Sequence, residues 1–153
     1  MSVEDRLKEL GYTLPPAQGP KGSYLTALRV GDLLYTAGMA SFNGGELKYL
    51  GKVGRDLGVR EGYEAAKLTA LNLISVIREE LGDLDRVERV VKLLAFVNCT
   101  GDFTEQPAVA NGASDLLVEV FGEQGRHVRS AVGVYSLPMN FAVEIEMVVK
   151  IKE

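Results

Sequence analysis

Apolar residues in this chain recur at helical spacing in two long segments and at strand spacing in several shorter ones. Within residues 60–81 they are separated by three and four positions, which predicts one face of a long helix that ends at Gly82. Residues 102–121 predict a second helix in the same way. Residues 1–22 are expected to form a short N-terminal helix followed by a loop rich in Gly and Pro.

The shorter apolar runs predict strands that bracket the two helices. They are residues 25–30, 33–37, 47–50, 87–97, 130–137 and 141–151. Gly31-Asp32 is a two-residue hairpin signal between the first two runs, and Pro138-Met139-Asn140 is expected to join the last two as another hairpin. The resulting order, ββ(β)αβαββ, predicts an α+β fold with both long helices on one face of a mainly antiparallel sheet.

The strand predicted at residues 87–97 indicates that the chain assembles with copies of itself. Strict alternation gives it two apolar faces, with Val91, Leu93, Ala95 and Val97 on one side and Val90, Leu94 and Phe96 on the other. Two helices cover one face of a sheet, and no further segment is available to cover the second. We therefore expect the second face to pack against another subunit.

Composition describes an ordinary globular chain, with 46% hydrophobic and 25% charged residues among 153. This length suits a single domain over residues 1–153, with residues 1–22 as an N-terminal extension. The net charge of −4 makes a nucleic-acid partner unlikely, apart from a small basic cluster at residues 126–129. An acidic N-terminus without a signal peptide, and no apolar span, predict a cytoplasmic protein with no membrane partner.

The chain contains few groups that could carry metal or nucleophile chemistry. One cysteine, Cys99, and one histidine, His127, exclude an internal disulfide and a standard zinc site, so no metal is expected. Cys99 has the apolar context of a core residue. His127, between two arginines, is interpreted as part of a solvated basic turn, and Asn111-Gly112 within a helix is attributed to close helix packing.

Two side chains stand out: Arg129, which lies just before an apolar strand, and Glu144, which lies in the middle of one. A guanidinium beside such a strand needs a partner or a bound anion, and a carboxylate in the middle of a strand needs a partner or a task. From the pattern alone, two interpretations stay open. The pair is either a structural ion pair, within one chain or between subunits, or part of a catalytic site.

Two segments of the chain resemble the RidA/YjgF family, also labelled the endoribonuclease L-PSP family. They are Arg129-Ser130 through Leu137-Pro138 to Val143-Glu144-Ile145-Glu146, and the stretch YLTALRVGDLLYTAGM at residues 24–39. The resemblance covers residues 20–151 and suits a longer branch of about 150 residues. It implies a chorismate-mutase-like fold and a homotrimer with clefts between subunits.

The resemblance also implies roles for particular residues. Arg129 would hold the carboxylate of a small ligand, and Glu144 would handle the proton of an attacking water. Three further positions would bind the substrate, Tyr24 by lining the cleft and Gly38 and Ala131 through their backbones. Asn111 corresponds to a cleft asparagine of the family. The chain departs from the family at Ala37, which replaces a serine, at Ala131, which replaces a frequent cysteine, and at His127, which replaces a proline.

The function implied by this resemblance is the hydrolysis of small 2-imino or 2-enamino acids to 2-oxo acids and ammonia without a cofactor. An alternative is a trimer that binds small carboxylates without turnover. Endoribonuclease activity is the third possibility, and the acidic net charge argues against it.

Overall fold

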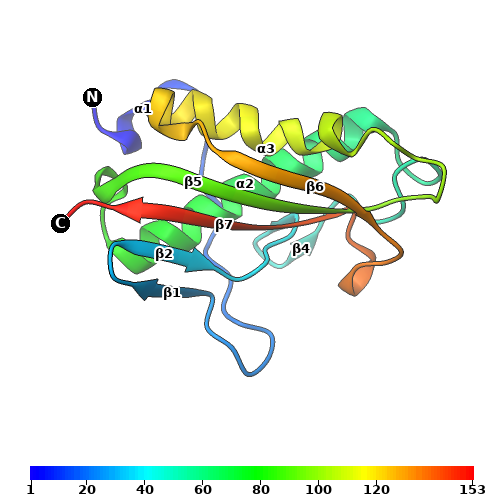
Figure 1. The fold of residues 1–153 in the computed structure, drawn as a ribbon, viewed down its shortest axis with the longest axis horizontal. Coiled ribbons are helices and arrows are strands. Elements are labelled where there is room, and N and C mark those ends of the chain that lie inside the picture. Colours follow the sequence, from blue (N-terminus) through cyan, green and yellow to red (C-terminus); the bar gives the residue numbers. More distant parts are fainter.

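The computed structural model describes residues Met1–Glu153 and shows a sheet with helices on one side (Figure 1). The helices are α1 (Val3–Glu9), α2 (Val59–Leu81) and α3 (Gln106–Phe121), and the strands are β1 (Ala27–Val30), β2 (Leu33–Thr36), β3 (Phe42–Asn43), β4 (Glu46–Leu47), β5 (Val87–Asn98), β6 (Val128–Val134) and β7 (Val143–Ile151). Short 3-10 turns are η1 (Leu84–Arg86), η2 (Gly122–Gly125) and η3 (Pro138–Asn140). The main sheet has the order β1-β2-β7-β5-β6, while β3 and β4 form a separate ribbon. The α+β class with a mainly antiparallel sheet is confirmed.

The predicted hairpin between the last two strands is wrong. Strand β6 pairs in parallel with β5, whereas β7 lies between β2 and β5 and is antiparallel to both. The physical reason is helix α3, because a strand, a helix and a strand in sequence return the chain in its original direction and favour parallel pairing. The turn η3 then carries the chain back to the sheet centre, with positive φ angles of 54° at Met139 and 62° at Asn140.

The prediction that β5 alternates strictly between two faces is also wrong at its start. A register shift between Val90 and Lys92 places Val90 on the same buried side as Leu93, with no exposed surface at either residue. Val91 is half-buried. Beyond the bulge the alternation holds, so Leu94 and Phe96 lie on the opposite face and remain half-buried in the single chain.

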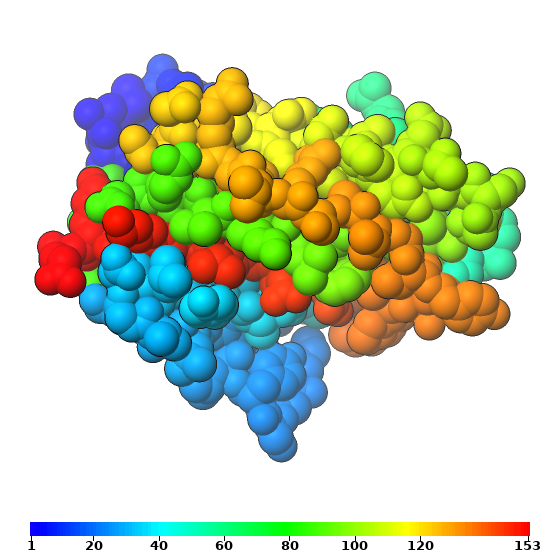
Figure 2. Space-filling model, in the orientation of Figure 1, coloured from blue at the N-terminus to red at the C-terminus, as the bar shows by residue number.

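The uncovered face of the sheet has apolar side chains on every strand, interrupted by Lys92 on β5 and by charged side chains on β7. One continuous row of paired residues crosses it, formed by Leu28, Tyr35, Val148, Lys92 and Val128. Leu28 is 53% exposed, Tyr35 44% and Val128 67%. Figure 2 shows this face directly, with no helix in front of the strands. Such a contiguous apolar surface is typical of an interaction site.

Helices α2 and α3 cover the other face of the sheet, and the two helices contact each other closely. A Cβ atom built on Gly112 would lie 1.9 Å from the Tyr63 carbonyl oxygen, so the two helix backbones touch where only glycine fits. Close packing thus explains the glycine inside the helix, as expected. Helix α3 starts at Gln106 rather than near residue 102, because Asp102 accepts a hydrogen bond from the Thr100 hydroxyl at 2.8 Å in the preceding loop.

Residues 1–22 are attached to this helical layer. Ser2 caps α1 by accepting from the backbone N–H of Asp5, and Leu7 is buried. Arg6 Nε donates to the carbonyl of Glu119 in α3 at 3.0 Å, which ties the extension to the second long helix. Neither α2 nor α3 is apolar enough over its length to cross a membrane, and the same holds for α1.

Gly112→Ala should destabilise the protein by about 3 kcal/mol or more, because the new methyl meets backbone atoms that cannot rotate away. Urea unfolding measures the change. The matched control is Gly101→Ala, where no atom lies within 4 Å of the added methyl and a change within about 0.5 kcal/mol is expected. Equal stability of the two variants would show that α2 and α3 are not in backbone contact.

Candidate functional site

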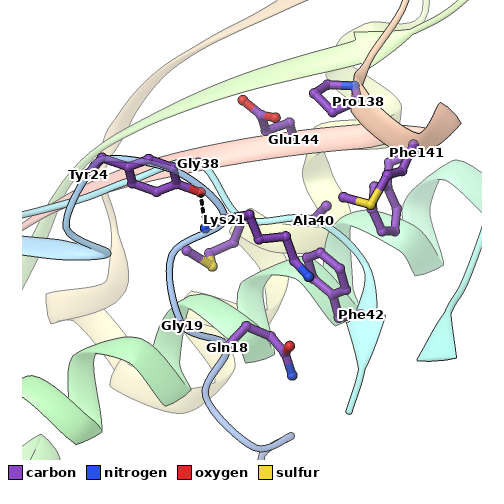
Figure 3. Close-up of a pocket in the computed structure, with 12 residues that line it drawn as sticks. Gln18, Gly19, Lys21, Tyr24, Gly38, Ala40, Phe42, Pro138, Phe141 and Glu144 are labelled. Atoms are coloured by element: carbon purple, nitrogen blue, oxygen red, sulfur yellow. Dashed lines mark hydrogen bonds between the residues drawn. The ribbon is translucent and has the colours of Figure 1, made fainter. Parts of the chain in front are cut away.

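A cavity of about 350 Å³ opens between the loop before β1 and the turn before β7. Its lining consists of Gln18, Gly19, Lys21, Tyr24, Gly38, Met39, Ala40, Phe42, Pro138, Met139, Phe141 and Glu144. Figure 3 shows the labelled members of this set around an open space, with Glu144 at one end and Gln18 at the other. In Figure 2 the corresponding hollow lies between the blue loop and the orange turn. The cavity is mostly apolar, with few charged groups.

Glu144 reaches this cavity because the pairing of β2 and β7 is interrupted beside it. Met147 donates its backbone N–H to the Thr36 hydroxyl at 3.0 Å, and the ladder resumes where Met39 and Ile145 exchange two hydrogen bonds of 2.9 Å. The chain between these points passes close to the glutamate. A Cβ atom on Gly38 would lie 2.7 Å from Glu144 Oε2, so the absence of a side chain at Gly38 makes room for the carboxylate.

The environment of Glu144 raises the pKa of its carboxyl group. Partial burial disfavours the charged form most strongly, and the neighbouring carboxylate of Glu146 adds repulsion. No hydrogen bond or ion pair within the chain offsets these effects. A carboxyl group that faces a cavity and has a raised pKa exchanges its proton at a higher pH than an exposed glutamate does.

The residues before β1 form the opposite wall of the cavity. The Tyr24 hydroxyl accepts the backbone N–H of Lys21 at 3.1 Å, which folds the loop back toward the cavity (Figure 3). The Lys21 ammonium lies 5.1 Å from the centre of the Phe42 ring. Sequence reasoning identified Tyr24 but missed Gln18 and Lys21, since their segment has the composition of a plain turn and no motif. It also missed Phe42, which lies in the short strand β3.

Arg129 lies away from this cavity, on β6 at the sheet edge. It pairs with Leu93, and its side chain turns toward α3, where Nη1 donates to the Ser114 hydroxyl at 2.9 Å and Nη2 to the Pro107 carbonyl at 3.1 Å. None of the six ion pairs in the chain includes Arg129. The guanidinium is therefore held by uncharged groups and keeps an unbalanced positive charge.

The other two expected substrate-binding residues lie near Arg129. Ala131 is two positions further along β6 and so faces the same side of the sheet, half-buried. Asn111 is exposed on α3, three residues before Ser114 and four after Pro107, which puts it on the helix face that meets Arg129. The six predicted site residues thus form two groups, with Tyr24, Gly38 and Glu144 at the cavity and Arg129, Ala131 and Asn111 at the edge.

The two groups lie on opposite faces of the sheet within one chain. Glu144 pairs with Phe96 on the uncovered face, whereas Arg129 pairs with Leu93 on the face that packs against the helices. Arg129 and Glu144 therefore form no ion pair inside the chain. They could face one another only across a boundary between two copies.

The expectation that His127 lies in a solvated basic turn is wrong. The imidazole is half-buried, with Nδ1 2.7 Å from the Gly125 carbonyl oxygen and Nε2 2.8 Å from the Ser114 hydroxyl. Burial lowers the pKa of His127 despite the bond to Gly125, and the nearby Arg129 charge lowers it further. No cluster of three or more His, Cys, Asp or Glu side chains occurs that could hold a metal ion.

Fold and site together define a class of protein: a chorismate-mutase-like α+β chain with a mostly apolar cavity that holds one carboxyl group, Glu144. A family model described as "YjgF/chorismate_mutase-like, putative endoribonuclease" matches residues 4–150, and the chain belongs to this family.

Relatives show how far the similarity extends. Protein TCP17 of Trypanosoma cruzi is 46% identical over 150 residues, which cover 97% of this chain and 94% of the relative. The structure of Atu1372 from Agrobacterium tumefaciens, described as of unknown function, is 44% identical with a TM-score of 0.92, over 98% of this chain and 92% of the other. RidA from the Antarctic bacterium Psychrobacter sp. PAMC 21119 is 26% identical with a TM-score of 0.61, over 90% and 94%. The detailed geometry is thus closer to Atu1372 than to RidA.

Glu144→Gln should stabilise the protein at pH 8 and leave its stability unchanged near pH 3. A carboxyl whose pKa is raised by folding binds protons more readily in the folded chain, so stability falls as pH rises past its unfolded value of about 4.3. The amide side chain of the Glu144→Gln variant does not ionise, so the variant does not lose this stability as the pH rises. Thermal melting at several pH values measures the difference.

Glu46→Gln removes one carboxylate from exposed β4 and serves as the control for charge alone. A melting difference between wild type and Glu144→Gln that does not change with pH would contradict the raised pKa.

Proposed function

We propose that this protein hydrolyses small 2-imino or 2-enamino acids to 2-oxo acids and ammonia, in clefts shared by neighbouring copies of a homotrimer. One observation carries the proposal. Glu144 and Arg129 each lack a charged partner within the chain, and they lie on opposite faces of the sheet. Family membership and the fold shared with RidA support the same proposal.

The physical requirements of assembly support a shared cleft. The apolar row across the uncovered face needs a cover, and a symmetric ring of copies would supply it. The edge of β6 and the cavity of the next copy would then meet at each boundary. Each cleft would contain Arg129 with Asn111 and Ala131 from one copy, and Tyr24, Gly38 and Glu144 from the other.

The chemistry follows from the charges of these groups. The Arg129 guanidinium, held by neutral acceptors, would bind the substrate carboxylate with its remaining N–H groups. Ionised Glu144 would take a proton from water as the oxygen adds to the imine carbon. The resulting carboxylic acid would return this proton to nitrogen, which gives a carbinolamine. Glu144 would then take the carbinolamine hydroxyl proton and pass it to the amino nitrogen, so that the C=O bond forms as the C–N bond breaks and ammonia leaves with the 2-oxo acid. Each proton is accounted for, and no cofactor takes part.

The wall of the cavity opposite Glu144 would receive the side chain of the substrate. Phe42, Phe141 and Met39 offer an apolar surface, with the Lys21 ammonium at its rim. We therefore expect imines of apolar or aromatic amino acids to be preferred over the smallest ones.

Arg129→Ala and Glu144→Gln should each abolish acceleration of imine loss in an amino-acid oxidase reaction. Mixing the two unfolded variants and refolding them together should restore activity, since some clefts then take an intact half from each chain. If the two variants assemble at random, about one quarter of the clefts combine an intact Arg129 from one chain with an intact Glu144 from the other. The imine assay on the mixture measures this recovery.

Refolding each variant alone is the control, and it should recover no activity. A mixture as inactive as its components would place both residues in one chain and exclude the shared cleft. Binding of 2-oxobutanoate to the wild type without any turnover would instead identify a carboxylate-binding protein.

Tyr35→Glu should convert the trimer into monomers, because the charge would be buried in the apolar face between copies. Light scattering gives the mass, which for one chain is 16.6 kDa. Leu47→Glu is the matched control, with 38% exposure on β4 against 44% for Tyr35. A trimeric Tyr35→Glu variant would show that another surface mediates assembly.

A further inference from the structure

We propose that Ser114 and His127 are positioning residues that hold the Arg129 guanidinium ready for an anionic ligand while leaving its charge unneutralised. This inference rests on the proposed function, in which Arg129 binds the substrate carboxylate. It assigns a task to two residues outside the six predicted site positions.

The argument starts from three consecutive hydrogen bonds. Arg129 Nη1 donates to the Ser114 hydroxyl at 2.9 Å, the hydroxyl lies 2.8 Å from His127 Nε2, and His127 Nδ1 lies 2.7 Å from the Gly125 carbonyl oxygen. The chain of bonds therefore runs from β6 to α3 and ends at the backbone of η2. These elements are brought together by the crossover between β5 and β6.

The direction of each bond follows from what its atoms can do. A carbonyl oxygen only accepts, so His127 Nδ1 must carry the proton. The uncharged imidazole then has a lone pair on Nε2, which accepts the proton of the Ser114 hydroxyl. That hydroxyl is left with its lone pairs facing Arg129. The carbonyl of Gly125 thus sets the tautomer of His127, which sets the orientation of Ser114.

The charges around His127 favour this neutral form. Arg129 faces it from β6, and Arg126 precedes it, ion-paired with Glu123 at 3.3 Å. Arg89 of β5 donates to the Arg126 carbonyl at 2.8 Å and adds a further positive charge nearby. From α3 the neighbouring side chains are uncharged, being Ser114 and Val118. Three arginines against one exposed glutamate oppose a charged imidazole.

Holding an arginine through neutral groups differs from holding it through a carboxylate. A carboxylate would fix the guanidinium equally well but would compete with the ligand for its charge. Here the Ser114 hydroxyl and the Pro107 carbonyl use two of the five N–H groups and leave three for the ligand. Because Ser114 and His127 already hold the Arg129 side chain in place, less conformational entropy is lost when a ligand binds to it.

Calorimetric titration of the intact protein with 2-oxobutanoate tests the pair. Ser114→Ala and His127→Leu should each weaken binding about tenfold, as expected for the loss of one hydrogen bond that orders a charged group. Ser114→Thr keeps the hydroxyl and His127→Gln keeps an acceptor near Nε2, so both should bind like wild type. Ser114→Ala should add nothing to Arg129→Ala, because the serine acts through the arginine.

The outcomes separate this inference from the function on which it rests. Wild-type binding by Arg129→Ala would overturn the proposed function together with the positioning role. Lost binding in Arg129→Ala, with wild-type binding in Ser114→Ala, would overturn the positioning role alone.

A second measurement uses the unmodified protein. His127 is the one histidine in the chain, so its two ring nitrogens give the imidazole ¹⁵N signals without assignment by mutation. We expect the proton on Nδ1 at pH 7. A proton on Nε2 would break the chain of donors at Ser114 and contradict the positioning role.

Discussion

The position of β7 at the centre of the sheet is the constraint on which the rest of the structure depends. It pairs with β2 on one side and β5 on the other, and its inward residues Ile145 and Met147 are almost fully buried. A slip of one residue would exchange its two faces, and burial of the apolar side excludes that slip. The register that buries Ile145 therefore also places Glu144 on the opposite face. The core thereby sets the location of the acid group at the cavity.

The same sheet keeps Glu144 apart from Arg129. Pairing of β6 with β5 places Arg129 on the helix side, where neutral groups of α3 hold it. One face of the sheet thus holds Glu144 without a cationic partner, and the other holds Arg129 without an acidic partner. If Glu144 and Arg129 formed a buried ion pair within one chain, each charge would be neutralised by the other. Their separation keeps each available for a ligand.

Much of the fold could be predicted from local pattern, because α3 and β7 have one buried face each and the apolar residues of α2 recur at regular helical spacing. The hairpin was wrong because pairing partners are chosen by the crossover through α3, which short-range turn signals do not reveal. The buried state of Val90 was missed because a bulge inverts alternation without any mark in the residue types.

The candidate site was predictable to a similar degree. Arg129 and Glu144 stand out in the sequence because charge is rare inside apolar strands. The contact of His127 with Ser114 could not be predicted, since it depends on how α3 lies across β6. Lys21 reaches the cavity wall only because Tyr24 folds its loop back. Such contacts are decided by tertiary packing and have no local signature.

The bare backbone at Gly38 restricts how this family branch can evolve. A Cβ atom there would lie 2.7–3.0 Å from three side-chain atoms of Glu144, so a replacement of Gly38 requires the carboxylate to move. Adaptation of the cavity to new ligands must therefore proceed through its neighbours. Gln18 and Lys21 lie in an irregular loop that tolerates substitution and even changes in length. Substitutions that change the shape of the cavity are thus accommodated more easily in the loop of residues 18–21 than at Gly38.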